Sequence, residues 1–334
     1  MKLEGHFLAG VLAITSWVSR RGRIACKLLT AAACATAVYS TTAPAADYIR
    51  YVSVTGSDAN LCTLAAPCRS LQRGINRTPA GGELRILASG DYGTSASVTK
   101  SMTISGNGNT VFAGSPLTIN QAGAVVTLRG LVLDGRGMVG HGIEIFAAAA
   151  VHIERCVIRG FPGRGIQAAP IEGTEVSVID SIVRDNGDGI GIGSPASMAT
   201  IDNSHFHNNT SSGVLVIHGQ TTISRSTASY NHGSGIRVSY GVVDIMSTTA
   251  TGNDTGFRVQ GSGGILTVES SIAHGNNTAG LEVAYGRALI SNSTFTHNGI
   301  GVSNGSLVET RQNNTIRFNG LDVKTQPLAP IGGM

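Results

Sequence analysis

Residues 235–255 read GIRVSYGVVDIMSTTATGNDT, and this stretch decides the fold. Apolar and polar residues alternate twice in it, over Gly235–Val238 and again over Val243–Ile245, as in short β-strands with one buried face. Asn253 lies near its end, and the same pattern restarts at Gly256. Because one such unit is too short to bury a core of its own, the units must stack on one another.

The opening glycine returns at intervals of 21 to 24 residues. It occurs at Gly142, Gly165, Gly189, Gly213, Gly235, Gly256, Gly280 and Gly301. From Gly189 on, an asparagine precedes each of these glycines by three or four residues, and one more follows the last glycine. These are Asn186, Asn209, Asn231, Asn253, Asn276, Asn298 and Asn319. A period of about 22 residues accommodates three short strands and their turns but no helix.

Other positions repeat in step with the asparagines. A small residue lies five positions earlier in each unit: Ser181, Ser204, Ser226, Thr248, Ser271 and Ser293. Apolar residues lie three and eight positions earlier, as with Ala250 and Ile245 before Asn253. Such columns predict that equivalent residues stack at the inter-strand spacing of about 4.8 Å. We therefore expect the asparagines to form a structural ladder in a turn.

In this pattern the chain resembles the right-handed parallel β-helix proteins, the fold of pectate lyases and other polysaccharide-active enzymes. The expected fold is all-β, a single-stranded right-handed parallel β-helix with three short strands per coil and an N-terminal cap. Residues 47–82 resemble the cap of secreted β-helix proteins, with Ser70 as the N-cap of a short helix over Leu71–Ile75. We expect the solenoid over 83–323 and an irregular tail over 324–334.

Residues 1–46 are predicted to be a signal peptide. A basic region that includes Arg20 and Lys27 precedes twelve mostly apolar residues, 28–39, and the small-residue site Ala43-Pro44-Ala45. The protein is therefore expected to be exported to the periplasm or the cell exterior. No later run is long enough to span a membrane.

Removal of this segment would bring the net charge of the chain close to zero. It holds 5 of the 24 basic residues and 1 of the 20 acidic ones, which leaves 19 of each. The basic balance of the full chain thus gives no argument for nucleic-acid binding.

Cysteine usage is typical of an exported protein. Cys62 and Cys68 are predicted to form a disulfide in the cap. Cys156 falls in or beside the small-residue column and is expected to be a buried hydrophobe. The spacing of cysteines and histidines indicates no metal site.

In enzymes of the resembling fold, the active site lies on the outer face of the first strand of the coil. The outward positions expected there are His152, Glu154, Asp180, Asp202, Asn203, Arg225, Asp244 and Glu269. The catalytic candidates among them are Asp180, Asp202, Arg225 and Asp244.

In a lyase, carboxylates would hold calcium and Arg225 would be the base. In a glycoside hydrolase, two of the aspartates would flank the bond. Alternatively, these charges are ordinary surface pairs.

A second surface favours binding. The third strand and the turn after it carry the substrate-binding candidates His218, Arg237, Tyr240, Arg258 and Tyr285. Tyrosine packs on sugar rings and arginine binds carboxylates, so a carbohydrate polymer of the uronate type is the expected partner. Signature motifs of pectate lyases, polygalacturonases and alginate epimerases are absent, so the sequence names no reaction, cofactor or oligomeric state. A non-catalytic structural or adhesion module is the alternative.

Overall fold

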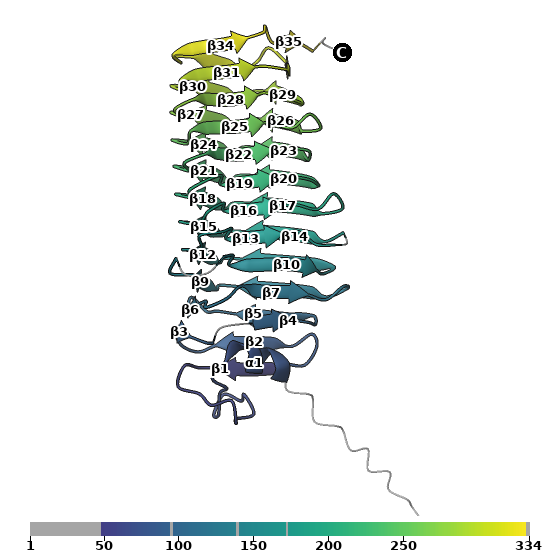
Figure 1. The fold of residues 1–334 in the computed structure, drawn as a ribbon, viewed down its shortest axis with the longest axis vertical. Helices are drawn as coiled ribbons and strands as arrows, with labels where there is room; N and C mark the ends of the chain where they lie inside the picture. The colour runs from purple at the N-terminus through teal and green to yellow at the C-terminus, as the bar shows by residue number, and fades with distance from the viewer. Residues whose placement is uncertain (1–47, 94–95, 138–139, 172, 332–334) are drawn as a thin grey trace, which may run out of the picture. The chain divides into compact units, whose positions relative to one another are not determined.

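The computed structural model describes residues 48–331, except residues 94–95, 138–139 and 172. The predicted signal peptide, residues 1–46, lies outside this part. Each coil of the chain passes through three parallel sheets in a fixed order, here named sheets A, B and C (Figure 1). The three-strand coil predicted from the repeat is thus confirmed.

Sheet A has 13 strands and sheets B and C have 11 each. Sheet A contains β1 (Ile49–Val52), β2 (Glu83–Ile86), β5 (Met102–Ser105), β8 (Val125–Arg129), β11 (Ala150–Glu154), β14 (Glu175–Ile179), β17 (Met198–Asp202), β20 (Gln220–Ser224), β23 (Val242–Met246), β26 (Ile265–Glu269), β29 (Arg287–Ser291), β32 (Leu307–Thr310) and β35 (Ala329–Pro330). Sheet B contains β3 (Gly90–Asp91), β6 (Thr110–Phe112), β9 (Val132–Asp134), β12 (Val157–Arg159), β15 (Ile182–Arg184), β18 (His205–His207), β21 (Thr227–Ser229), β24 (Thr249–Thr251), β27 (Ile272–His274), β30 (Thr294–Thr296) and β33 (Thr315–Arg317). Sheet C contains β4 (Ala96–Val98), β7 (Leu117–Asn120), β10 (Ile143–Ala147), β13 (Ile166–Ala168), β16 (Ile190–Ile192), β19 (Val214–Val216), β22 (Ser234–Val238), β25 (Thr255–Val259), β28 (Ala279–Val283), β31 (Ile300–Asn304) and β34 (Leu321–Thr325).

The core runs along the inside of the three sheets. An apolar residue lies eight positions before each ladder asparagine from Asn186 to Asn298, and all six are buried: Val178, Ile201, Ile223, Ile245, Val268 and Ile290. In the column three positions before the asparagine, large Phe206 and Phe295 bracket the small Ala228, Ala250 and Ala273. This alternation of size lets rings fill space that the alanines leave, as close packing requires.

The asparagines lie between sheets B and C and are hydrogen-bonded to one another; those from Asn186 to Asn298 are buried, and Asn319 at the end is half-buried. The Asn231 Nδ2 donates to Asn253 Oδ1 at 2.9 Å, and the Asn253 Nδ2 donates to Asn276 Oδ1 at 3.1 Å. The same side-chain contact joins neighbours from Asn186 to Asn319. Each inter-coil bond thus satisfies polar groups that no solvent reaches.

A second polar column lies between sheets A and B and consists of the small residues. The backbone N–H of Ser181 donates to Ser204 Oγ at 3.1 Å, and that of Ser204 donates to Ser226 Oγ at 3.2 Å. Each hydroxyl in turn donates to the carbonyl two residues earlier, as Ser204 does to Asp202 O at 2.9 Å. At two of the three turns of the coil, side chains therefore hydrogen-bond to the next coil.

Cys156 occupies the first position of this serine column. Its N–H donates to Ser181 Oγ at 3.1 Å, and its Sγ lies 3.3 Å from Glu154 O, where the neighbouring coils place a hydroxyl. Burial raises the pKa of the Cys156 thiol to about 11, so the reactive thiolate is scarce at neutral pH.

We expect Cys156→Ser to leave the unfolding midpoint unchanged or higher, because serine supplies the stronger hydrogen-bonding group that the column uses elsewhere. Native protein should also resist thiol labelling at pH 8 until it is unfolded. The two measurements are a urea unfolding curve and labelling with a thiol reagent. Prompt labelling of the native wild type at Cys156 would contradict the placement.

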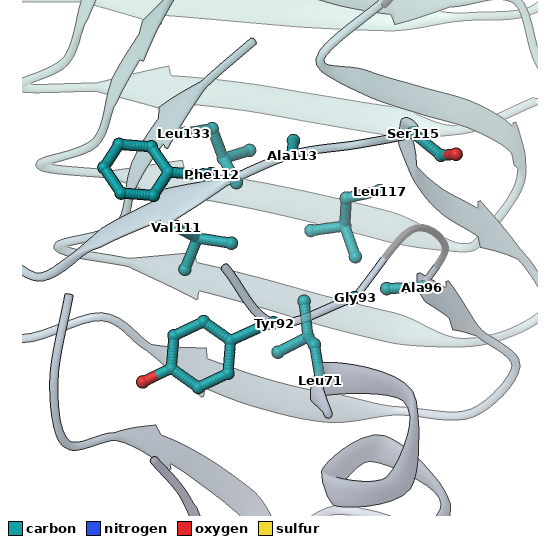
Figure 2. Close-up of a pocket in the computed structure, with 10 residues that line it drawn as sticks. All are labelled: Leu71, Tyr92, Gly93, Ala96, Val111, Phe112, Ala113, Ser115, Leu117 and Leu133. Carbon is teal, nitrogen blue, oxygen red and sulfur yellow. The ribbon is translucent and has the colours of Figure 1, made fainter. Parts of the chain in front are cut away.

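The N-terminal cap is held by local contacts. Ser70 Oγ accepts from Arg73 N at 3.2 Å and caps α1 (Leu71–Arg77), which extends two residues beyond the predicted helix. A disulfide joins Cys62 to Cys68. A cavity of about 20 Å³ lies between α1 and the first coils, lined mainly by apolar side chains (Figure 2). That volume holds about one water molecule, so the cavity is a packing gap and not a ligand site.

At the other end, pairing continues into the segment expected as an irregular tail. The strand β34 ends at Thr325, and β35 pairs with β32. Asp322 Oδ1 accepts from Asn319 Nδ2 at 3.0 Å, which gives the last asparagine of the column a partner. Lys324 and Pro330 lie on these terminal strands, where a charge or a proline discourages edge pairing with another chain.

Candidate functional site

Three of the catalytic candidates lie close together, but two of them are not on a strand. Asp180 and Arg225 follow the ends of β14 and β20, in the turn to sheet B, with φ of 52° and 49°. Asn203 has the same left-handed conformation one coil away from each. The expectation that these residues lie on the outer strand face is therefore corrected. The column itself is as expected: it runs through successive turns beside Asp202, the last residue of β17.

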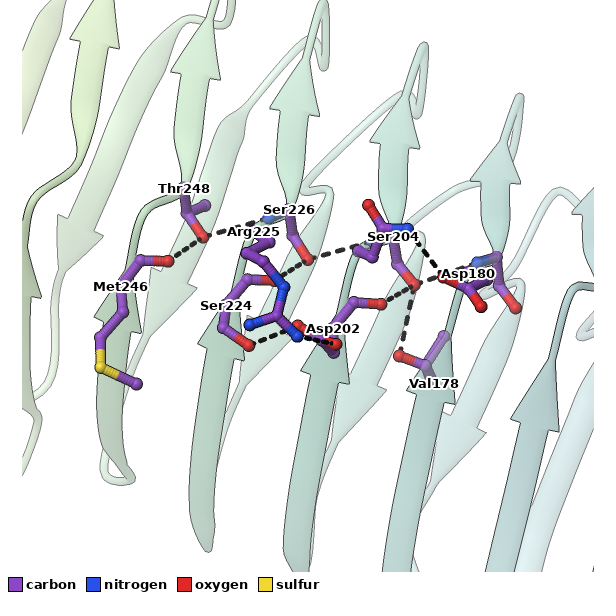
Figure 3. A network of polar contacts seen from close by, with 11 residues as sticks. Val178, Asp180, Asp202, Ser204, Ser224, Arg225, Ser226, Met246 and Thr248 are labelled. Carbon is purple, nitrogen blue, oxygen red and sulfur yellow. Dashed lines mark hydrogen bonds and ion pairs between the residues drawn. The ribbon is translucent and has the colours of Figure 1, made fainter.

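The turn residues form one polar network with Asp202 (Figure 3). Asn203 Nδ2 donates to Asp180 Oδ1 at 2.7 Å. Asp202 accepts from Ser224 Oγ at 2.6 Å and is paired with Arg225 through its other carboxylate oxygen. Both oxygens of Asp202 thus have protein partners.

Asp244 does not join this network. The sheet register aligns Asp202 with Ser224 and Met246, so Asp244 lies two coils and two residues away. At about 4.8 Å per coil and 3.3 Å per residue, the two Cα atoms are roughly 12 Å apart. At this spacing, the two carboxyl groups reach the roughly 6.5 to 9.5 Å of an inverting glycosidase only if both side chains turn toward each other, and they do not reach the roughly 5 Å of a retaining one.

The contacts of Arg225 also bear on the lyase hypothesis. Its guanidinium is ion-paired with Asp202 and its side chain is 66% exposed. A guanidinium offers five N–H donors and no acceptor, so one held in such a pair is poorly suited to remove a proton. The geometry favours the interpretation of this network as surface pairing across coils.

Other outward residues of sheet A are similarly engaged. His152 Nδ1 lies 2.8 Å from Ser177 Oγ in the next coil, and Arg129 Nε donates to Glu154 Oε2 at 2.9 Å. Within the described part of the chain, no three His, Cys, Asp or Glu side chains are grouped so that they could hold a metal ion.

The binding candidates of sheet C lie on a different face. Gln167, Gly191, Leu215, Arg237, Arg258 and Glu282 follow one another in register along its outside. The Arg258 Nε lies 3.2 Å from Glu282 Oε2, within ion-pair distance but outside hydrogen-bond alignment. Arg237 has no such acidic neighbour in register.

One feature of this face was missed by sequence reasoning. Arg164 pairs with Asp188 at 3.2 Å and lies across Gly191, where a Cβ would be 2.6 Å from the Arg164 Cδ. The signal was present in Gly189-Ile190-Gly191-Ile192, because a glycine inside a strand marks the close approach of another group.

His218 and Tyr240 meet in the turns between sheets C and A. Their rings stack with centroids 5.4 Å apart and planes 18° apart. The backbone of Gly263 lies near the Tyr240 ring in the next coil. Tyr240 is nevertheless 55% exposed, so part of its ring remains open to solvent.

Tyr285 lies further along the same row of turns and is 62% exposed. It borders a shallow depression of about 500 Å³ with Arg287, Ile265 and Leu307. The floor contains Gly263, Gly264 and Gly286. An exposed aromatic ring, an arginine and aliphatic side chains around an open depression are the groups that carbohydrate sites combine.

The chain belongs to the right-handed β-helix family: the family model, described as "Right handed beta helix region", matches residues 83–241 and 141–321. A pectate lyase, Pel9A, is similar in structure, with a TM-score of 0.53 and 17% identity over 83% of this chain and 78% of that one. The A-module of the mannuronan C-5 epimerase AlgE6 from Azotobacter vinelandii is also similar, with a TM-score of 0.51 and 18% identity over 76% of this chain and 90% of that one. At these identities the likeness concerns the fold.

No curated protein sequence matches the chain. Among the described residues, no helix has the length and hydrophobicity of a membrane span.

Proposed function

We propose that this protein is exported and binds an acidic polysaccharide, of the uronate type, without cleaving it. The observation that carries the proposal is the depression at Tyr285, which offers an exposed ring and the Arg287 guanidinium side by side in the row of turns. Export is supported by the predicted signal peptide and by the Cys62–Cys68 disulfide, which is stable in oxidising compartments.

Binding without turnover follows from how the charged groups are used. In the network, Asp180 accepts a hydrogen bond from Asn203, and the two carboxylate oxygens of Asp202 are engaged by Ser224 and Arg225. None of these residues borders the depression at Tyr285. The two similar structures are those of a pectate lyase and a mannuronan epimerase, which supports a polyuronate as the first ligand to test.

We expect Tyr285→Ala to weaken binding of polygalacturonate or alginate by roughly tenfold, since an aromatic contact contributes about 0.5 to 1.5 kcal/mol beyond the area it buries. The measurement is affinity electrophoresis in gels that contain the polymer. Tyr230→Ala is the matched control, because Tyr230 is 63% exposed at another corner of the coil. Equal mobility of Tyr285→Ala and wild type, or equal losses in both variants, would refute the assignment of this depression.

A further inference from the structure

Arg237 is set apart from the other arginines of the sheet C face by its lack of partners. Arg164 is paired with Asp188, and Arg258 lies against Glu282. Arg237, in contrast, has no hydrogen-bond or ion-pair partner among the described residues, and its Nε is sealed from solvent without one. Leaving a guanidinium partly buried and unpaired is unfavourable, so this position is one where function rather than stability selects the residue.

The surroundings of Arg237 leave one positive charge in excess. Burial lowers the pKa of Arg237, Asp188 raises it, and the neighbouring Arg258 and Arg164 lower it. Since Asp188 and Glu282 each already face another arginine, the three arginines share two carboxylates. A guanidinium remains charged at neutral pH even so. The face therefore lacks one negative group at Arg237.

We infer that Arg237 binds the carboxylate of a sugar residue and makes the protein selective for uronates over neutral sugars. The planar guanidinium matches a carboxylate through two parallel hydrogen bonds. A single negative charge suits the single excess positive charge. Tyr285 lies two coils further on, about 10 Å along the solenoid, so one polymer chain can contact both positions. This inference rests on the proposed polysaccharide binding and adds the group that would decide selectivity.

The test compares polygalacturonate with its fully methyl-esterified form, which has the same backbone but no carboxylate. The dissociation constant is measured for wild type, Arg237→Gln, Arg237→Lys and Arg311→Gln. Arg311 is exposed and is the control for simple loss of one positive charge. Unchanged thermal unfolding verifies that each variant is folded, which we expect because Arg237 has no partner to lose.

We expect the wild type to prefer the unesterified polymer by roughly tenfold or more, in line with a charge-assisted hydrogen bond. Arg237→Gln should remove most of this preference and leave binding of the esterified polymer unchanged, since only Arg287 of the Tyr285 depression would then remain to favour a free carboxylate. Arg237→Lys should retain part of the preference, because lysine keeps the charge but lacks the planar pair of N–H donors, and Arg311→Gln should behave as wild type. Selectivity as strong as that of the wild type in Arg237→Gln, or equal wild-type affinity for both polymers, would overturn this inference alone. If the wild type binds neither polymer, the proposed function fails as well.

Discussion

Replacing Asn253 with leucine is expected to lower the free energy of unfolding by several kcal/mol. The side chain accepts from Asn231 N and Asn231 Nδ2, both at 2.9 Å, and donates to Ala228 O at 2.9 Å and to Asn276 Oδ1 at 3.1 Å. All of these groups are buried, and each one left without a partner costs about 1 to 3 kcal/mol. Leucine cannot replace any of the four bonds.

The measurement is equilibrium unfolding in urea, with Asn277→Leu as the control. Asn277 is the exposed neighbour of Asn276, so its replacement should change stability by less than about 0.5 kcal/mol. If Asn253→Leu unfolds at the same urea concentration as wild type, the asparagine column does not hold the coils together.

A comparable loss is expected for Gly189→Ala, the mildest possible change at a repeat glycine. A Cβ there would lie 2.4 Å from the carbonyl oxygen of Gly213 and 3.0 Å from the Phe206 ring. The carbonyl belongs to the backbone of the next coil and cannot turn away, so the two coils must separate. Overpacking of this kind costs roughly 1 to 3 kcal/mol or more.

Gly140→Ala is the matched control for this substitution. Its φ is not left-handed, and a Cβ would meet no atom within 4 Å. The control should be neutral in a thermal melt, while Gly189→Ala should melt several degrees lower. Equal melting of the two variants would show that the close approach of Gly189 to Gly213 is not required.

The period of the repeat predicted the coil because the residues that repeat are those that line the interior or face the next coil. The glycine column is spaced so that each member faces the next coil too closely for a Cβ, as Gly189 and Gly256 show. Residues such as Ile245 and Ala250 alternate with the pleat and could be assigned to the core from sequence alone. These features are local and repeat in every coil.

The candidate site was less accessible to sequence analysis. In sheet A, the alternation of apolar and polar residues continues from the strand into the turn. Nothing in the sequence therefore indicates that Asp180 and Arg225 have a left-handed backbone and lie outside the strand. The stack of His218 on Tyr240 depends on two side-chain conformations in adjacent coils. The isolation of Arg237 depends on which acids its neighbours had already paired with. These properties depend on contacts between coils and produce no pattern in the sequence of a single coil.

Binding without cleavage is tested by the size and elution of a polyuronate after incubation with the purified protein, with and without calcium. We expect the protein to elute together with polygalacturonate or alginate and the polymer to keep its full length. Shortening of the polymer, lost again in Asp202→Ala, would contradict it and assign catalysis to the network around Asp202. Elution of the protein apart from every acidic polymer would contradict the binding function itself.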